Sequence, residues 1–380
     1  MICLDELRAK IDLIDHDLLN LFLKRMETAK QIGLYKKENG LPIFDRSRER
    51  EILCNLTEGV NPELQGFVKV LFTTLFEMSR SYQSSNISET SDVQRLIDNA
   101  IQSTPKEFPK SAVVACQGVE GAYSQIACDK LFSLPNIMFC DTFESVFQAV
   151  ESGLCQYGIL PLENSTAGSV NQVYDLMNRY NFYIARSVRL SIQHTLLAKH
   201  GILLSNVKEI FSHEQAIQQC SQFLNSLPNV KVTVCENTAT AAKLAAESNR
   251  NDIAVISSKD CTELYGLSVL SYNIQNTDNN YTRFICISKK LEIYPGAHKT
   301  SVMLTLSHKP GALYQVMAKF NALNINLNKL ESRPIPGRDF EFKFYFDIDS
   351  SVYSEEFKQV LSELESETAM FDYLGSYQEI

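Results

Sequence analysis

Two sets of polar residues in this 380-residue sequence are of the types that can bind and transform a small anionic molecule. The first set consists of charges on predicted helices near the amino terminus. The second consists of hydroxyl, amide and imidazole side chains beside predicted strands in the middle of the chain. Such groups supply charge stabilisation and proton donation.

The charges of the first set lie where an amphipathic helix should be apolar. Over residues 4–36 the apolar residues recur at helical spacing, and this spacing continues into Arg25 and Lys36, with Arg8 beside the stripe. A buried unpaired charge costs several kcal/mol, so these cations need anionic partners. The next two predicted helices add polar residues to similar faces, namely Asp45, Arg48, Glu49, Ser79 and Gln83.

These cations have two possible kinds of partner. Arg25 or Lys36 can pair internally with Asp45 or Glu49. Alternatively, the cations bind a dianionic ligand. Because the inward cations outnumber the nearby inward acids, we favour the dianion, whose carboxylates arginine would bind bidentately.

The second set comprises four short motifs at predicted strand ends, namely residues 117–124, 163–166, 212–215 and 279–284. Helix N-termini with free N–H groups are ready anion sites, although each motif by itself is more typical of a helix cap. Four such motifs in one region favour a binding cleft. The glycine-rich first motif has no GxGxxG pattern, so a nicotinamide cofactor is not indicated.

Composition restricts the class of protein. A net charge of −9 argues against a nucleic-acid partner. The ten cysteines include no CxxC pair and indicate thiols in a reducing compartment, not disulfides or a zinc site. The early charges are untypical of a signal peptide, and no apolar run is long enough to span a membrane. We predict a soluble cytoplasmic protein that needs no cofactor or metal and has no membrane partner.

The elements that carry the first set form a predicted all-α domain over residues 1–88. We expect one helix over residues 4–36, about 45 to 50 Å long, a second from Asp45 and a third from Pro62 to about residue 83. Two shorter helices cannot cover the long apolar stripe alone. The pattern therefore predicts dimerisation through this region.

The second set lies in residues 111–290, where short apolar strands alternate with helical patterns and predict an α/β fold. A weak repeat aligns residues 141–160 with residues 237–256, an offset of 96. It predicts two lobes with a ligand cleft between them, although composition alone can make βα units resemble each other. The preceding residues 89–110 are polar and predict a linker with at most a short helix near residues 93–101.

Residues 298–380 have a third rhythm, the βαββαβ order of ferredoxin-like folds. The predicted strands cover residues 302–307, 325–331, 340–348 and 370–377, and the predicted helices cover residues 311–323 and 355–367. Polar turns follow the first two strands. By themselves these turns are ordinary turn chemistry.

Residues 1–85 resemble the all-helical chorismate mutase family through LRAKIDLID, Arg25, GLYKKENG and DRSRERE. The resemblance implies that Arg25 and Arg48 bind the substrate carboxylates, and that Arg8 does so in the other subunit's site. The family rearranges chorismate to prephenate pericyclically. Such a reaction needs orientation and charge stabilisation but no nucleophile.

The same resemblance assigns roles to the remaining residues of the first set. It implies that Lys36 and Gln83 hydrogen-bond the ether oxygen of chorismate, where negative charge grows as the bond breaks. It also implies that Asp45, Glu49 and Ser79 hold the ring hydroxyl and the cations.

Residues 111–290 resemble prephenate dehydratase, a two-lobed α/β fold like that of periplasmic binding proteins, through the GxxGAYS turn, PLENSTAGSV, SHEQA and TRF. The family removes the ring carboxylate as CO₂ together with the ring hydroxyl. The resemblance implies that Thr282 donates a hydrogen bond or proton to the departing hydroxide. The substrate-binding residues that it implies are Asn164, Ser165, Thr166, Gln215, Arg283 and Phe284.

Some roles in this region stay open. Arg283 either binds a carboxylate or braces its loop, and His213 is either an acid or a structural residue. Glu163 either braces its loop or contacts substrate. The family usually has a proline where Glu214 stands, which weakens the assignment of the neighbouring Gln215.

Residues 298–380 resemble the ACT regulatory domain that accompanies this family, through GAL and ESRP. The resemblance implies an allosteric phenylalanine site at a dimer interface, formed by Gly311, Ala312, Leu313, Glu331, Ser332 and Arg333. Backbone N–H groups near Gly311 would bind the carboxylate of phenylalanine.

The three resemblances follow the order of the bifunctional chorismate mutase–prephenate dehydratase family. They imply the substrates chorismate and prephenate, a phenylalanine effector, and a homodimer or higher homo-oligomer. One alternative is a dehydratase that prefers arogenate and has a decayed mutase. A second is an amino-acid sensor whose cleft binds without reacting.

Overall fold

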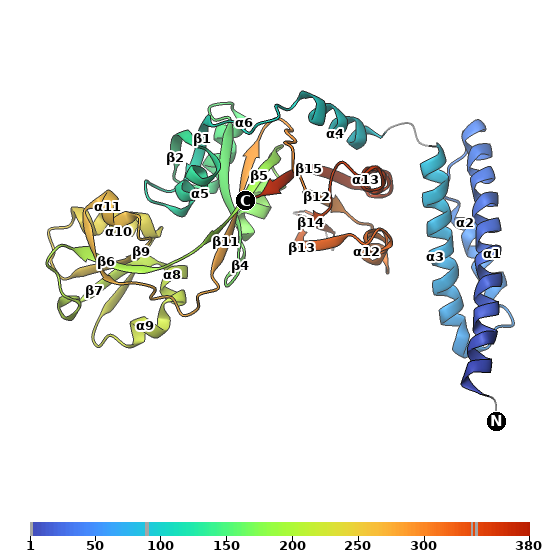
Figure 1. Cartoon of the computed structure of the whole chain (residues 1–380), viewed down its shortest axis with the longest axis horizontal. Coiled ribbons are helices and arrows are strands. Elements are labelled where there is room, and N and C mark those ends of the chain that lie inside the picture. The colour runs from blue at the N-terminus through green and yellow to red at the C-terminus, as the bar shows by residue number, and fades with distance from the viewer. Residues whose placement is uncertain (1–2, 88–90, 336, 339–340) are drawn as a thin grey trace. The chain divides into compact units, whose positions relative to one another are not determined.

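The computed structural model describes residues 3–87, 91–335, 337–338 and 341–380 (Figure 1). Its contacts group into two units. The first comprises Met1–Arg95 with Gln359–Glu367, and the second comprises Leu96–Lys358 with Thr368–Ile380. The first set of polar residues lies in the first unit and the second set lies in the second.

The first unit contains the three predicted helices, α1 (Leu4–Glu38), α2 (Arg46–Thr57) and α3 (Pro62–Ile87). The prediction of one long helix over residues 4–36 is confirmed, because no proline interrupts the pattern. The α2 helix begins after Asp45, whose carboxylate accepts a hydrogen bond from the Arg48 backbone N–H and so caps the helix. Pro62 stands at the first position of α3, where its missing N–H has no cost.

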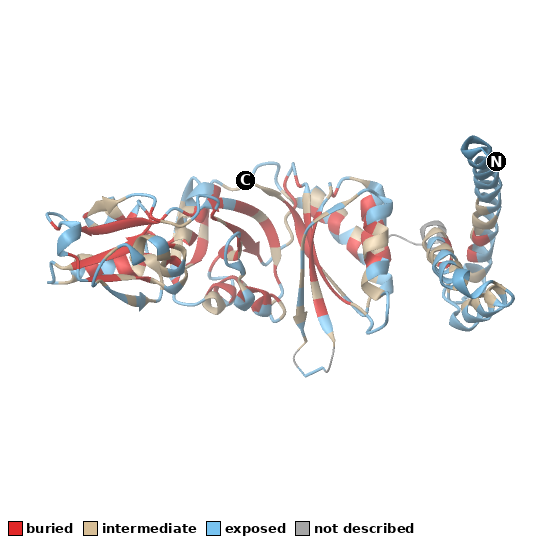
Figure 2. Ribbon diagram, turned by 90° about the horizontal axis from the view of Figure 1, so that it is seen from below, coloured by how far each residue is buried: buried red, intermediate tan, exposed pale blue. Residues whose placement is uncertain are grey.

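The α1 helix leaves most of its apolar residues uncovered within one chain. Its buried residues are Ala29 and Gly33. By contrast, Leu4, Ile11 and Leu18 keep 60%, 55% and 54% of their surface exposed. Figure 2 shows this helix in pale blue over most of its length. A large apolar surface therefore remains on α1.

The segment predicted as a linker contains one helix, α4 (Asp92–Ser103), so the short helix expected near residues 93–101 is confirmed. The α/β region that follows has two sheets. The first contains β1 (Ser111–Gln117), β2 (Leu134–Cys140), β3 (Tyr157–Asn164), β5 (Tyr183–Ser191) and β11 (Tyr281–Ser288), with β4 (Gly168–Ser169) paired to β3. Its helices are α5 (Tyr123–Leu131), α6 (Phe143–Glu151) and α7 (Asn171–Met177).

The second sheet forms the other lobe of the α/β region. Its strands are β6 (Thr195–Lys199), β7 (Glu209–His213), β8 (Lys231–Cys235), β9 (Ile253–Ser257) and β10 (Leu267–Ser271). The accompanying helices are η1 (Leu204–Asn206), α8 (Glu214–Gln219), α9 (Ser221–Asn225), α10 (Thr238–Glu247) and α11 (Cys261–Tyr265). Both lobes belong to the second unit.

The repeat seen in the sequence corresponds to a repeated topology. In the first sheet β1 lies between β2 and β3 and is parallel to both, and in the second sheet β7 lies in the same way between β8 and β9. The strands β3 and β9 begin at Tyr157 and Ile253, at the predicted offset of 96 residues. The prediction of two similar lobes is confirmed.

The last part of the chain has the predicted βαββαβ order. Its elements are β12 (Lys299–Thr305), α12 (Ala312–Ala322), β13 (Asn326–Pro334), β14 (Phe342–Asp349), α13 (Glu355–Glu367) and β15 (Met370–Glu379). The strands pair antiparallel in the order β13-β14-β12-β15, as in ferredoxin-like folds. Residue 340, the predicted start of the third strand, lies outside the described residues.

This carboxyl-terminal sheet continues directly into the first sheet of the α/β region. Gln378 and Glu379 of β15 pair in parallel with β5. Gly375 permits the close approach, because a Cβ atom at this position would lie 2.7 Å from the carbonyl oxygen of Ile184. The predicted domains 111–290 and 298–380 thus share one sheet and, apart from Gln359–Glu367, one compact unit.

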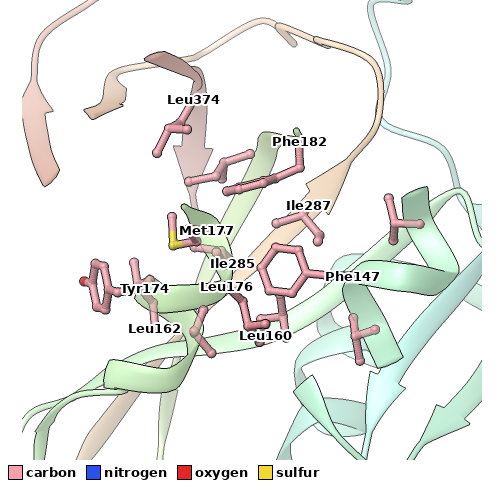
Figure 3. Close-up of a cluster of buried hydrophobic side chains, with 14 of the residues drawn as sticks. Phe147, Leu160, Leu162, Tyr174, Leu176, Met177, Phe182, Ile285, Ile287 and Leu374 are labelled. Atoms are coloured by element: carbon pink, nitrogen blue, oxygen red, sulfur yellow. The ribbon is translucent and has the colours of Figure 1, made fainter. Parts of the chain in front are cut away.

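A shared hydrophobic core accompanies the shared sheet. Leu160, Leu162 and Ile285 of the α/β region pack in one buried cluster with Leu374 of β15 (Figure 3). The fully buried Tyr377 belongs to the same cluster. Side chains in such close-packed interiors transmit a displacement of one element to its neighbours. No helix of the described chain has the length and apolar character needed to cross a membrane.

Candidate active sites

Arg25 is the central charge of the first site. Its guanidinium donates hydrogen bonds to the carbonyl oxygen of Leu75, at 3.0 Å, and to Ser79 Oγ, and it lies 5.6 Å from the ring centroid of Phe76. Burial lowers the pKa of Arg25, and the nearby Glu49 partly opposes this shift. Among the described residues no carboxylate is paired with Arg25, so its charge is available to a ligand.

Lys36 lies at the other end of the same helical face. Its ammonium donates to the carbonyl oxygen of Ile43 at 2.6 Å, in the turn between α1 and α2. Asp45 caps α2, accepting from Ser47 Oγ at 2.8 Å and from the Arg48 N–H at 3.0 Å. These bonds, with that from the Arg48 N–H the largest cause, lower the pKa of Asp45. Lys36 also has no carboxylate partner in the described part of the chain.

Glu49 has a partner that the sequence interpretation missed. It forms an ion pair with Arg80 of α3, whose guanidinium also lies 5.0 Å from the ring centroid of Phe44. Arg48 pairs with Glu51 on the solvent side at 2.9 Å. The internal pairing of Arg25 or Lys36 with Asp45 or Glu49 is therefore not found, because Arg80 takes Glu49 and the helix end takes Asp45.

The α3 face of this site is buried. Ser79 and Gln83 keep only 6% and 7% of their surface exposed. Ser79 donates to the carbonyl oxygen of Leu75 at 2.7 Å, and the side-chain oxygen of Gln83 has no hydrogen-bond partner among the described residues. A buried amide oxygen without a partner is costly, and a ligand with a donor group would satisfy it.

Arg8 lies apart from this cluster. It pairs with Asp5 near the start of α1. Seventeen residues of one helix separate Arg8 from Arg25, or about 26 Å at 1.5 Å per residue. The site of one chain therefore does not contain its own Arg8.

The second site is a cavity of about 420 Å³ between the two lobes of the α/β region. Strands β3 and β11 of the first sheet contribute Asn164, Thr282 and Phe284, and α8 of the second lobe contributes Gln215 and Gln219. The cavity has the size and the place between lobes that are typical of small-ligand sites. The predicted cleft is confirmed.

Thr282 and Asn164 form the centre of this cavity. They are directly paired in the antiparallel ladder of β11 and β3. The side-chain amide of Asn164 donates to Thr282 Oγ1 at 2.9 Å and to Asn280 Oδ1 at 2.8 Å. Since Thr282 Oγ1 accepts this bond, its own proton remains available, and among the described residues no acceptor holds it. Thr282 is therefore set up as a hydrogen-bond donor to a ligand in the cavity.

Gln219 and His194 extend the network and were missed by sequence reasoning. Gln219 donates to Thr166 Oγ1 at 2.8 Å and accepts from Asn280 Nδ2 at 3.0 Å. His194 Nε2 lies 2.8 Å from the same Gln219 oxygen, so the ring carries its proton on Nε2. Burial lowers the pKa of His194 and keeps the ring neutral. Gln219 ends a short helix without a motif of its own, and this left no signal in the sequence.

The rest of the ENST stretch supports Asn164 instead of lining the cavity. Ser165 Oγ donates to the carbonyl oxygen of Asn279 at 3.0 Å and accepts from the Tyr281 N–H, so it fastens two loops together. Thr166 Oγ1 donates to Asn164 Oδ1 at 2.7 Å and fixes the orientation of that amide. Of these three expected substrate-binding residues, Asn164 alone lines the cavity, since β3 ends at this residue.

Gln215 and His213 lie where the second lobe faces the cavity. His213 Nδ1 accepts the Gln215 backbone N–H at 3.2 Å and caps α8, which settles its structural role. Burial lowers the pKa of His213, although Glu214 opposes this shift. A neutral ring that accepts through Nδ1 carries its proton on Nε2 and can donate a hydrogen bond from there.

Arg283 points away from the cavity, which corrects its assignment as a substrate-binding residue. Successive residues of a strand face opposite sides of the sheet, so Thr282 and Phe284 face the cavity while Arg283 does not. Arg283 forms ion pairs with Asp347 and Glu163. Glu163 also binds Lys329 at 2.8 Å and is therefore a brace.

The cavity offers polarised backbone instead of cationic side chains to an anion. Among the described residues that line it there is no lysine or arginine. Five helices begin at its wall, since the first turns of α5, α6, α7, α8 and α10 contain the lining residues Tyr123, Phe143, Gln172, Gln215 and Thr238. Helix N-termini carry partial positive charge and free N–H groups, which suits carboxylates. No group of three or more potential metal ligands is found among the described residues.

The residues expected to bind phenylalanine lie in two places. Gly311 precedes α12 with a left-handed backbone (φ 86°), and Ala312 and Leu313 open that helix. Glu331 and Arg333 on β13 instead contact the α/β region: Glu331 accepts from Ser169 Oγ at 2.6 Å, and Arg333 forms a two-pronged ion pair with Asp175. Ser332, which lies between them on β13, faces the opposite side of the strand and is exposed.

Comparison with known proteins supports both sites. The family model "Prephenate dehydratase" matches residues 114–292, and the model "Chorismate mutase type II" matches residues 7–84. A bifunctional chorismate mutase/prephenate dehydratase of Escherichia coli is 32% identical over 381 residues, covering 98% of this chain and 95% of that protein. An arogenate dehydratase/prephenate dehydratase of Arabidopsis thaliana is 38% identical over 276 residues, covering 70% of this chain and 72% of that protein.

A solved structure has the same fold over the second unit. It is a prephenate dehydratase from Arthrobacter aurescens in complex with L-Phe, with a TM-score of 0.65 and 27% sequence identity. The match covers 70% of this chain and 89% of that one.

A helical unit with unpaired cations, followed by a two-lobed α/β unit with a hydroxyl-lined cleft, defines a two-site enzyme acting on small carboxylates. The chain belongs to the bifunctional chorismate mutase/prephenate dehydratase family. It rearranges chorismate to prephenate and then converts prephenate to phenylpyruvate, two consecutive steps of phenylalanine biosynthesis.

Proposed function

We propose that Thr282 is the residue that assists the loss of the ring hydroxyl of prephenate. The carbon–carbon bond to the ring carboxylate breaks, CO₂ leaves, and its electron pair completes the aromatic ring as the carbon–oxygen bond to the hydroxyl breaks. The hydroxyl leaves as hydroxide with the electron pair of the carbon–oxygen bond. Thr282 donates a hydrogen bond to this departing oxygen, while Asn164 donates a hydrogen bond to Thr282 Oγ1. The observation that carries this proposal is the hydrogen bond from Asn164 to Thr282 Oγ1. Because Thr282 Oγ1 accepts this bond, and no described residue accepts its own proton, that proton is available to the substrate.

Gln215, Gln219 and the helix N-termini around the cavity bind the substrate in this proposal. The polarised N–H groups attract the substrate carboxylates. The cavity lining has no lysine or arginine among the described residues, so no cationic side chain there stabilises the charged ring carboxylate before CO₂ leaves. Phe284, which is buried and lines the cavity, packs against the ring. Ser165 and Thr166 act through Asn164.

For the mutase step, Arg25 and Arg48 bind the two carboxylates of chorismate, and Lys36 and Gln83 stabilise the ether oxygen. The absence of a carboxylate partner for Arg25 and Lys36 in the described chain supports this assignment. Gln83 contributes through its amide N–H₂ group. Asp45, Glu49 and Ser79 orient the ring hydroxyl and these cations, with Arg80 holding Glu49.

The mutase site is completed across a homodimer in this proposal. The distance from Arg8 to Arg25 within one helix supports a role for Arg8 in the site of a second chain. The exposed apolar residues of α1 supply the surface on which two such helices pair. Each mutase site is therefore complete only in a dimer or in a higher homo-oligomer that contains this dimer.

The carboxyl-terminal ferredoxin-like part is an ACT domain that binds phenylalanine and inhibits the dehydratase. The structural relative from Arthrobacter aurescens, which was solved with L-Phe, supports this role. Gly311, Ala312, Leu313 and Ser332 are the proposed contacts. Glu331 and Arg333 hold the domain against the α/β region and transmit the effect of binding. The enzyme works in the cytoplasm, where its ten cysteines remain thiols.

A preference for arogenate is the second candidate function. The Arabidopsis thaliana relative is named for both arogenate and prephenate dehydratase. Purified protein is supplied separately with chorismate, prephenate and arogenate, each with and without phenylalanine. We expect phenylpyruvate from the first two substrates and inhibition by phenylalanine. Turnover of arogenate alone would establish the second candidate, and binding of phenylalanine without any turnover would establish a sensor.

A further inference from the structure

The two central residues of the dehydratase cavity have neighbours that face the opposite way. Asn164 and Thr282 are paired across β3 and β11, and the adjoining pair is Glu163 and Arg283. Alternation along both strands places this second pair on the back of the sheet. The side of the sheet behind the cavity therefore carries two charged side chains at this position, where apolar side chains are more common.

Arg283 is anchored in the carboxyl-terminal sheet. Arg283 is 6% exposed, and its guanidinium pairs with Asp347 of β14, which is completely buried. Asp347 Oδ1 accepts hydrogen bonds from the hydroxyls of Ser301, Tyr345 and Tyr377, of which that from Tyr345 measures 2.6 Å. Burial disfavours the charged guanidinium, but the combined attraction of Asp347, Tyr377, Tyr345 and Glu163 outweighs it and raises the pKa of Arg283. Three hydroxyls and the Arg283 guanidinium thus hold the buried Asp347 carboxylate in place.

Glu163 makes a second attachment to the same sheet. Its carboxylate binds Lys329 Nζ of β13 at 2.8 Å, and its other oxygen lies 3.0 Å from Arg283 Nε without the geometry of a hydrogen bond. Both residues that adjoin the Asn164–Thr282 pair are thus held by strands of the carboxyl-terminal sheet. A shift of β13 or β14 therefore pulls directly on the wall of the dehydratase cavity.

The surrounding core makes this connection stiff. Tyr345 and Tyr377, which donate to Asp347, pack in the same buried cluster as Leu160 and Ile285 of β3 and β11. Close-packed cores have discrete arrangements and do not deform continuously. A change in the carboxyl-terminal sheet is therefore passed to β11 instead of being absorbed between the two sheets.

We propose that Asp347 is a positioning residue for the dehydratase reaction, which acts through Arg283 to set the place of Thr282 and so links the carboxyl-terminal domain to the cavity. This inference rests on the proposed roles of Thr282 and of phenylalanine. Displacement of a catalytic group by about 1 Å can lower a rate about a hundredfold. An effector that favours another position of β14 is sufficient to inhibit the reaction.

Two variants test the link. Asp347→Asn keeps the shape of the side chain but leaves Arg283 without its buried counter-charge. The double variant Arg283→Met/Asp347→Leu removes both charges, a replacement that buried ion pairs generally tolerate. Glu209→Gln is the matched control, because Glu209 is also a buried carboxylate that holds Arg250, but it lies in the second sheet. The dehydratase kcat and KM for prephenate, the inhibition by phenylalanine and the calorimetric binding of phenylalanine are measured for each.

Asp347→Asn is expected to lower kcat about a hundredfold and to change KM for prephenate by less than about threefold. The double variant is expected to recover kcat to within about tenfold of the parent enzyme and to bind phenylalanine without being inhibited by it. Glu209→Gln is expected to keep both the parent rate and the parent inhibition. If Asp347→Asn does not fold, the double variant alone decides.

The proposal is overturned if Asp347→Asn keeps the parent kcat, or if the double variant is inhibited by phenylalanine as strongly as the parent enzyme. These failures are distinguishable from failure of the proposed function. An unimpaired Thr282→Ala variant would refute the role of Thr282 itself. A Thr282→Ala variant that is inactive, together with an unimpaired Asp347→Asn variant, would refute the link alone.

Discussion

At the scale of single residues, the function of the dehydratase cavity depends on which donors and acceptors remain free to bind substrate. Thr282 Oγ1 accepts from Asn164 and keeps its proton for the substrate, while Asn164 is itself held by Thr166. Neutral imidazoles take part in the same arrangement. His213 accepts through Nδ1 at the start of α8, and His194 donates toward Gln219. Protonation of His213 would replace the acceptor at Nδ1 with a donor and so break the hydrogen bond from the Gln215 N–H. Protonation of His194 would place a positive charge in a buried position.

His213 therefore gives a pH prediction. Its pKa in the folded protein lies below the ordinary value of 6.5, so the unfolded chain binds the proton more readily. The free energy of unfolding that this group contributes is present above about pH 6.5 and is lost as the pH falls below that value. His213→Asn keeps an acceptor for the Gln215 N–H but cannot titrate in this range.

Denaturant unfolding and the dehydratase rate are measured for both proteins between about pH 8 and pH 5. We expect the parent protein to lose stability and activity more steeply on the acidic side than His213→Asn. The titration of His194 is common to both proteins and cancels in the comparison. Identical pH profiles would show that His213 remains unprotonated for another reason or does not affect the site.

At the scale of elements, the first helix serves two functions. Its carboxyl-terminal half carries Arg25 and Lys36, while its amino-terminal half exposes apolar residues and Arg8. A helix of 35 residues is far longer than the 12 residues of α2 that accompany it. Its length is explained if it brings a charge to the site of a second chain, and this explanation gives a direct test.

Leu18→Glu places a charge on the exposed apolar stripe of α1 in the first unit, whereas the dehydratase cavity belongs to the second unit. We expect the molar mass measured by light scattering to shift toward the single chain, and the mutase rate to fall about tenfold or more through loss of Arg8. The dehydratase rate with prephenate should stay close to that of the parent. Leu203→Glu is the control, since it adds the same charge at a leucine that is 64% exposed in the second unit. A Leu18→Glu variant with unchanged mass and mutase rate would contradict the proposed dimer.

Element order was predictable from the sequence because apolar periodicity and turn residues are local properties. The helix over residues 4–36, the repeat at an offset of 96 and the βαββαβ order are all found in the structure. Asn164 and Thr282 were predictable as site residues because each stands in a distinctive motif at a strand end. The partners of these residues were not, since Gln219, His194 and Arg80 come from elements without a motif.

The orientation of the Arg283 side chain also could not be predicted from the sequence. It stands between two cavity residues in the TRF motif, yet the alternation of the strand turns it toward Asp347. Its charge suggested a substrate contact, while its actual partner lies 64 residues further along the chain. Tertiary pairing decided its role.

At the scale of the whole molecule, the chain carries two consecutive reactions in two separate units and joins its carboxyl-terminal domain to the second of them. The mutase residues lie in the first unit, and Thr282 lies in the second. Each reaction can therefore be removed without loss of the other. The carboxyl-terminal domain shares its sheet and a hydrophobic core with the α/β region that contains Thr282.

The central claim is tested most directly by following the products that a Thr282→Ala variant forms from chorismate. We expect prephenate to accumulate at the rate of the parent enzyme, while phenylpyruvate formation falls about a hundredfold or more. Thr282→Ser, which keeps the hydroxyl, should retain most of the second reaction. Phenylpyruvate formed by Thr282→Ala at the parent rate, or an equal loss of both reactions, would contradict the account.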